Sequence, residues 1–151
     1  MASPPADDEI VIPALLRSAR GSYGGAIRVR LTAAGFDDLP RHGAYVLGGM
    51  ANHGGSAGGL VRELGITKQA ASQLIDTLVV RGYLKRDINL SDRRRMTIEL
   101  TERGRAAAAA VRSGVNDVDA QLAELCPPAV LEGLRAGLMA LSEIRDRMED
   151  R

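Results

Sequence analysis

The stretch AGGLVRELGITKQAASQLIDTLVVRGYLKRDINLSDRRRMTIELTERGR, residues 57–105, decides the fold. A short apolar segment is followed by a turn at Gly65 and by a longer segment in which apolar residues recur at helical spacing. Two runs with period-two alternation then follow, 84–88 and 96–100, and the loop 89–95 joins them. A helix, a turn, a second helix and a strand pair predict a winged helix-turn-helix.

The second of these helices has two chemically different faces. Its apolar residues form one stripe that must face a core: Ile66, Ala70, Ala71, Leu74, Ile75 and Leu78. The polar residues lie opposite, with Thr67 as the expected N-cap: Lys68, Gln69, Ser72, Gln73 and Asp76. Glutamine can bond adenine edges, and lysine can reach guanine or phosphate. Alone, such a face is more simply an ordinary solvated surface. Asp76 does not suit a surface that faces DNA, so we expect it beyond the groove edge or paired with a nearby arginine.

The strand pair carries a local positive charge that the whole chain lacks. Residues 81–95 hold six cations against the anions Asp87 and Asp92, and the cations are Arg81, Lys85, Arg86, Arg93, Arg94 and Arg95. Adjacent arginines repel one another, so an anionic partner explains their clustering better than a solvated charge run. Arginine suits the negative potential of a narrow minor groove. We expect Asp92 to orient one of these arginines.

Composition limits the remaining classes. The chain has 151 residues, a net charge of +1, one cysteine and no tryptophan. The single Cys126 cannot form an intrachain disulfide, no apolar run is long enough to cross a bilayer, and we expect a cytoplasmic protein. The sequence offers no nucleophile beside a base, no phosphate-binding glycine loop and no metal-ligand cluster. We therefore expect no enzyme, no cofactor and no metal.

The predicted organisation is mostly α-helical with a small β-hairpin wing. We expect a disordered tail at 1–9 and a single domain at 10–151. The domain comprises N-terminal helices at 10–52, the winged helix-turn-helix lobe at 53–100 and C-terminal dimerisation helices at 101–151. The N-terminal helices are expected at 13–34, where the glycines at 21, 24 and 25 require close packing or a kink, and at 40–52. The glycine-rich segment 53–59 predicts a turn or a very short strand.

Two helices are expected after Thr101, a good N-cap, and Pro127-Pro128 separates them. The last helix carries leucines on a seam of 3.5-residue period: Leu131, Leu134, Leu138 and Leu141. Such a seam needs a partner. A second subunit is favoured over an intramolecular hairpin, which stays an alternative.

These motifs resemble the multiple antibiotic resistance regulator (MarR) family of bacterial transcription factors. The residues that carry the resemblance are 66–78, which resemble the recognition helix, 81–86 before the wing, Asp92-Arg93-Arg94 at its tip, and 100–104 after it. The chain departs from the family at Asn89-Leu90, where an Asp-Pro pair is common. The resemblance implies an obligate homodimer that binds a pseudo-palindrome and responds to a small ligand or an oxidant.

Family members often hold their effector between the dimerisation helices and the DNA-binding lobe. The polar and aromatic candidates there are Tyr23, Arg41, His42 and Tyr45. No spacing among them demands a ligand, so a plain structural role is the simpler interpretation. Cys126 has no cation next to it in the sequence, which favours a structural cysteine over an oxidant sensor.

Two functions follow from these observations. The first is a sequence-specific regulator of transcription, a repressor by family habit, that binds double-stranded DNA as a homodimer. Its DNA-contacting residues would be Thr67, Lys68, Gln69, Ser72, Gln73, Arg86, Arg93, Arg94 and Arg95. The alternative is a winged-helix module that docks a protein and does not bind DNA specifically.

Overall fold

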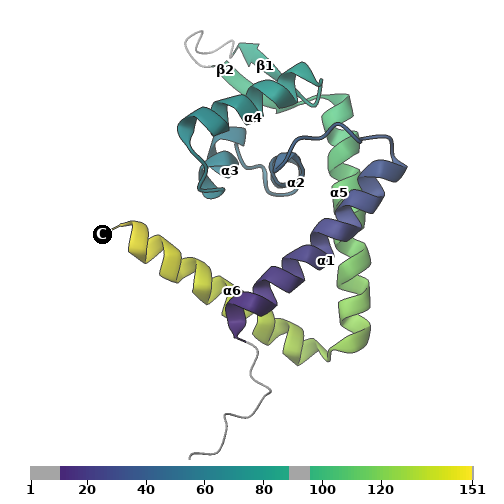
Figure 1. Ribbon diagram of the computed structural model, residues 1–151, viewed down its shortest axis with the longest axis vertical. Helices are drawn as coiled ribbons and strands as arrows, with labels where there is room; N and C mark the ends of the chain where they lie inside the picture. Colours follow the sequence, from purple (N-terminus) through teal and green to yellow (C-terminus); the bar gives the residue numbers. More distant parts are fainter. Residues whose placement is uncertain (1–10, 89–95, 151) are drawn as a thin grey trace, which may run out of the picture. The chain divides into compact units, whose positions relative to one another are not determined.

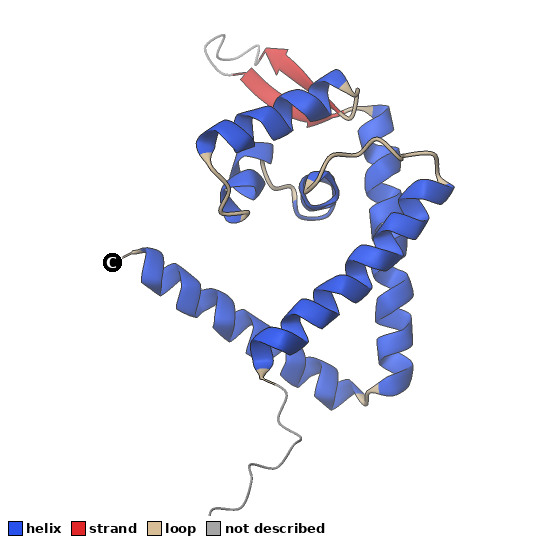
Figure 2. Ribbon diagram, viewed as in Figure 1, coloured by secondary structure: helices blue, strands red, loops and turns tan. Residues whose placement is uncertain are grey.

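The computed structural model describes residues 11–88 and 96–150, and this part of the chain forms six helices and one hairpin (Figures 1 and 2). The elements are α1 Ile12–Ala33, α2 Gly43–His53, α3 Ala57–Glu63, α4 Lys68–Val80, β1 Leu84–Ile88, β2 Met96–Leu100, α5 Glu102–Leu125 and α6 Pro128–Glu149. They belong to two compact units, one ending at Val115 and one starting at Asn116. The predicted mostly α-helical fold with a β-hairpin is confirmed. The tail expected at 1–9 lies outside the described residues.

Hydroxyl side chains fix three helix starts. The Thr67 Oγ1 accepts a hydrogen bond from the Ala70 N–H at 3.2 Å, and the Thr101 Oγ1 accepts one from the Gly104 N–H at 3.0 Å. Both caps confirm the prediction. The Ser56 Oγ likewise accepts from the Gly59 N–H at 3.1 Å, so α3 begins at Ala57. The predicted turn or strand over 53–59 was therefore wrong for its first residue, which ends α2, and for its last three. The Ser56 cap outweighs the poor helix propensity of two glycines in α3.

The hairpin has the predicted antiparallel alternation. Leu84 pairs with Leu100, Arg86 with Ile98, and Ile88 with Met96. The tight turn before β1 uses Gly82 at φ 77°, a left-handed conformation that glycine adopts without strain. The strand Leu84–Ile88 packs against α4, and this packing joins the wing to the helix-turn-helix.

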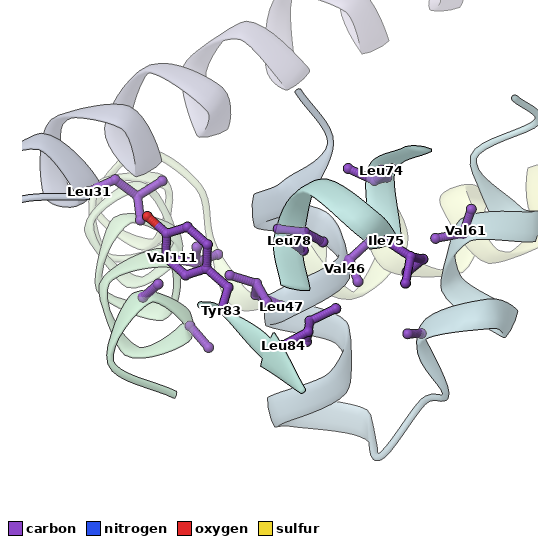
Figure 3. Close-up of a cluster of buried hydrophobic side chains, with 13 residues drawn as sticks. Leu31, Val46, Leu47, Val61, Leu74, Ile75, Leu78, Tyr83, Leu84 and Val111 are labelled. Carbon is purple, nitrogen blue, oxygen red and sulfur yellow. The ribbon is translucent and has the colours of Figure 1, made fainter. Parts of the chain in front are cut away.

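The core lies where α2, α4, the start of β1 and α5 meet (Figure 3). Its fully buried side chains are Val46 and Leu47 from α2, Leu78 from α4, and Tyr83 and Leu84 at the wing base. The apolar stripe of α4 ends in this core, as its periodicity predicts, and the opposite face of the helix is left exposed.

Helix α1 crosses α5 (Figure 1), and the glycine at the crossing belongs to α5 and not to α1. A Cβ on Gly114 of α5 would lie 2.6 Å from the Ile27 Cα, so only glycine permits this approach. The α1 glycines at 21, 24 and 25 have no described atom within 4 Å of a Cβ position. They lie within one helix, Ile12–Ala33, so close packing, one of the two alternatives for these glycines, is not found within the described chain.

The second unit contains the end of α5 and the whole of α6. No residue of α6 is buried, and its leucines remain exposed, Leu134 by 47%, Leu138 by 39% and Leu141 by 41%. Leu131 is half-buried. Among the described helices, none combines the length and apolar character that a membrane span needs.

Candidate nucleic-acid interface and ligand cavity

The exposed face of α4 carries the residues predicted to read DNA. Lys68, Gln69, Ser72 and Gln73 are all exposed, and Thr67 precedes them as the N-cap. The other face of α4 is buried in the core through Leu74, Ile75 and Leu78. The polar side chains are therefore accessible to a binding partner. The unpaired N–H groups at a helix N-terminus attract anions, and the Thr67 Oγ1 accepts a hydrogen bond from one N–H group of this end, that of Ala70.

A hollow of about 430 Å³ separates part of this face from the hairpin. Lys68, Ser72 and Asp76 line it from α4, and Arg86 and Ile98 line it from the strands. Gln69 and Gln73 do not line the hollow. The polar face of α4 therefore has two parts, a glutamine pair and a row that faces the hairpin.

Arg86 is bound to the recognition helix. Its Nη2 donates a hydrogen bond to the Asp76 Oδ1, and the pair is also an ion pair. The Asp76 side chain is 59% exposed and that of Arg86 is 38% exposed. The pairing of Asp76 with a nearby arginine was one of two outcomes that the sequence predicted.

On the other face of the hairpin, acidic side chains neutralise the charge of Lys85. The Lys85 Nζ lies 3.3 Å from the Glu99 Oε2 and 3.9 Å from the Asp87 Oδ2. The remaining predicted wing residues, Asp92, Arg93, Arg94 and Arg95, lie outside the described residues.

A cluster of three side chains fastens the base of the wing. The Tyr83 hydroxyl donates to the Asp38 Oδ1, and the Arg103 Nη2 donates to the same atom at 2.9 Å. The Arg103 guanidinium also lies 4.6 Å from the centre of the Tyr83 ring, a cation–π distance. Burial and the bond to Asp38 raise the pKa of Tyr83 to about 12, and the same bond lowers the pKa of Asp38.

This cluster was not predicted from the sequence. Asp38 belongs to the loop after α1, Tyr83 precedes β1, and Arg103 lies in the first turn of α5. The three residues lie far apart along the chain, and no periodic pattern connects them. Only the fold brings them together.

A cavity of about 1,080 Å³ lies in the first unit, between α1, the loop after it, α2 and α5. All four candidate effector residues line this cavity: Tyr23, Arg41, His42 and Tyr45. The Tyr45 hydroxyl donates to the Glu63 Oε2 at 2.5 Å, which connects the cavity wall to α3. Apolar side chains form other parts of the wall, among them Ile27, Leu31, Phe36, Leu60 and Val111.

The cavity is rich in arginine. Its wall includes Arg20 and Arg28 from α1, Arg41 from the loop before α2 and Arg112 from α5, against the acids Asp37 and Glu63. Among the described residues, none of these four arginines forms an ion pair. Burial, followed by the charges of Arg41 and Arg20, lowers the pKa of His42, which favours the neutral imidazole. The sequence analysis missed Arg20, Arg28 and Arg112, although two of them lie on one face of α1.

Cys126 is half-buried at the end of α5, where its N–H donates to the Leu122 carbonyl at 2.9 Å. A structural role for this cysteine stays a prediction. Among residues 11–88 and 96–150, no group of three or more histidine, cysteine or acidic side chains is arranged to hold a metal ion.

Comparison with known proteins identifies the lobe. A sequence model described as the MarR family matches residues 37–95, which run from the loop after α1 through the wing. No curated protein matches the chain significantly.

Solved structures share the fold over most of the chain. The S. aureus MepR–DNA complex has a TM-score of 0.68 at 20% identity and covers 89% of this chain and 98% of its own. CouR, a transcriptional repressor bound to a 23-mer DNA duplex, has a TM-score of 0.65 at 24% identity, with coverage of 87% and 92%. Wild-type MarR from E. coli has a TM-score of 0.62 at 18% identity, with coverage of 89% and 98%. The chain therefore matches the MarR family in sequence over residues 37–95 and shares the fold of these solved structures over most of its length.

Proposed function

We propose that this protein is a DNA-binding regulator of transcription, a repressor, that reads a duplex through α4 and grips it with the wing. The observation that carries the proposal is the exposed polar face of Lys68, Gln69, Ser72 and Gln73 on a helix whose opposite face is locked in the core. Beside it, residues 81–95 concentrate positive charge on an otherwise nearly neutral chain. This role requires binding and no catalysis.

In this proposal, each group has its own task. Gln69 and Gln73 contact base edges in the major groove, and Lys68 reaches guanine or phosphate. Thr67 and Ser72 hold phosphate oxygens, and Arg86, Arg93, Arg94 and Arg95 grip the backbone or the minor groove. Asp92 orients a wing arginine. MepR and CouR are described as bound to DNA, which supports the same use of this fold here.

The active form is proposed to be a homodimer. The exposed leucines of α6 form a continuous apolar seam, and an amphipathic helix with such a seam gains stability by burying it. A second copy of the chain offers the same seam and would place two recognition helices about one turn of DNA apart. The operator would then be a pseudo-palindrome.

Selection from a pool of random duplexes tests the proposal. Purified protein should enrich a sequence with twofold symmetry, and footprinting of the selected duplex should protect two half-sites about one helical turn apart. Affinity for the selected duplex should fall steeply with salt, as the release of counterions requires. No enrichment, with binding that ignores sequence, would favour the alternative of a winged-helix module that docks a protein partner.

We further propose that the arginine-lined cavity binds an effector, and that this effector is an anion with an apolar body. Four arginines that form no ion pair within the described chain surround apolar walls, and an anion would neutralise their mutual repulsion. Tyr23, Arg41, His42 and Tyr45 would hold its polar end. The effector would favour dimers whose recognition helices no longer match the operator.

Two probes of similar size and opposite charge test the choice of ligand. Naphthoate should raise the midpoint of thermal unfolding, and naphthylmethylammonium should not, because only ligands that prefer the native state stabilise it. The shift should shrink in Arg41→Gln. Equal shifts with both probes, or none with either, would contradict an anion site. MepR has been described bound to ethidium bromide, so the fold itself does not fix the charge of the ligand.

A further inference from the structure

The hairpin separates from α4 as it extends from its base. Leu84, Arg86 and Ile88 lie on one face of β1, because alternate residues of a strand share a face. Leu84 is 1% exposed and Ile88 is 61% exposed. On β1, apolar packing against the core therefore holds only the first residue of this face. On β2, the half-buried Ile98 also packs against the core, and it pairs with Arg86.

At that point an ion pair adds to the packing of Ile98. Among residues 11–88 and 96–150, the contact between Arg86 and Asp76 is the only hydrogen bond or ion pair that joins α4 to the strands of the hairpin. The hollow of about 430 Å³ lies beside it and is lined by the same two residues, by Ser72 and by Ile98. Beside the packing of Ile98, this pair therefore holds the outer hairpin in its direction relative to α4.

A contribution to folding stability does not explain the presence of the Asp76 carboxylate. Exposed ion pairs contribute little to the free energy of unfolding, and both members of this pair are more than a third exposed. On a face proposed to meet phosphates, a negative charge also opposes binding. A guanidinium has five N–H donors, so Arg86 can be held by Asp76 and still offer donors to a duplex.

We infer that Asp76 is a positioning residue that decides sequence specificity. Its carboxylate holds Arg86, and through Arg86 the hairpin, at a fixed distance from the glutamine pair of α4. Helix and wing then meet one duplex in a single register. The inference rests on the proposed function. Asp76 repels DNA, and in return it improves the discrimination between DNA sequences.

The test compares two truncations that each remove one negative charge. Asp76→Ala removes the acidic partner of Arg86, whereas Glu99→Ala removes the nearer acidic partner of Lys85 on the opposite face of the same hairpin. The affinity of each full-length variant is measured for the selected duplex and for a scrambled duplex of the same composition. Both variants should bind the scrambled duplex more tightly, by similar factors. Only Asp76→Ala should lower the ratio of the two affinities, by about tenfold, which is within the range found for coupled residues.

Two further variants separate positioning from a general structural effect. Asp76→Glu keeps a carboxylate within reach of Arg86 and should restore the ratio to within about twofold of the wild type. In an Arg86→Ala background, Asp76→Ala should lower the ratio no further, because residues that act as a unit are not additive. Thermal unfolding of every variant identifies any that fail to fold. If Asp76→Ala fails to fold, the affinity ratio of Asp76→Glu is compared with that of the wild type instead.

The outcomes distinguish this inference from the proposed function. A wild-type protein that does not prefer any duplex overturns the proposed function. If the wild type discriminates and Asp76→Ala behaves like Glu99→Ala, the function stands and the positioning role is wrong. A loss of discrimination that Asp76→Glu does not reverse also overturns the positioning role.

Discussion

At the scale of single residues, the wing is anchored by groups that meet only in the folded chain. Asp38 accepts hydrogen bonds from both Tyr83 and Arg103, and the Arg81 Nη1 donates to its carbonyl oxygen. These hydrogen bonds tie the loop after α1 to the end of α4, to β1 and to α5. Because neighbouring residues of this loop, Asp37 and Leu39, line the arginine-rich cavity, the loop connects the cavity wall to the wing base.

The effect of Tyr83→Phe on the free energy of unfolding should depend on pH if the Tyr83 hydroxyl anchors the wing. The pKa of Tyr83 is raised from 10.0 to about 12, so the folded chain holds the phenol proton more tightly than the unfolded chain does. The stabilisation is complete below pH 10 and is lost as the pH rises towards 12. Below pH 10, Tyr83→Phe should lower the free energy of unfolding by about 1 kcal/mol, the usual contribution of a hydrogen bond.

Urea denaturation of both proteins below pH 10 and between pH 10 and 12 measures the difference. The difference should shrink through the second interval. A difference that stays constant or grows there would show that the hydroxyl contributes in some other way.

At the scale of elements, local signals predicted most of the lobe. The apolar stripe of α4, the alternation of the two strands and the threonine caps at 67 and 101 are properties of neighbouring residues, so the sequence alone indicated them. The start of α3 was missed because two glycines concealed a serine cap. The Asp38 cluster and the cavity arginines Arg20, Arg28 and Arg112 were not predicted, since the residues around them lie on distant elements. The pairing of Asp76 was anticipated, but not its role.

The crossing of α1 and α5 gives a prediction about glycine. Gly114→Ala should destabilise the protein by about 1–3 kcal/mol, because the added Cβ would lie 2.6 Å from the Ile27 Cα and 2.7 Å from its N atom. Gly21→Ala is the control, since its Cβ meets no described atom within 4 Å. It should stabilise the protein by about 1 kcal/mol through better helix propensity. Thermal unfolding compares the two, and equal effects of both would refute a close approach at residue 114.

At the scale of the whole molecule, assembly is the main proposal beyond the single chain. Helix α6 has no buried residue, and its seam includes Leu134, Leu138 and Leu141. A helix of this kind in a protein of 151 residues leaves much of its apolar surface in water unless a partner covers it. The seam, the proposed palindrome and two recognition helices are consistent with a single twofold axis.

Leu138→Asp should therefore produce monomers, because a charge in an apolar seam is costly to bury. Ala136→Asp is the control, since a rotation of about 100° per residue places it on the opposite face of α6. Light scattering after size exclusion gives the mass of each variant. A wild type that is already monomeric, or a control that dissociates as readily as Leu138→Asp, would contradict the proposed interface.

The division of labour between α4 and the wing tests the central claim most directly. Affinities of Gln73→Ala and Arg94→Ala are measured over a range of salt concentrations for the selected duplex and its scrambled counterpart. Gln73→Ala should weaken binding to the selected duplex by about 1–3 kcal/mol and leave the scrambled one nearly unchanged. Arg94→Ala should weaken both, with a salt slope reduced by about 0.9 for each phosphate that the variant no longer neutralises. Equal losses of affinity on both duplexes for both variants would contradict the account of α4 as the reader and the wing as the grip.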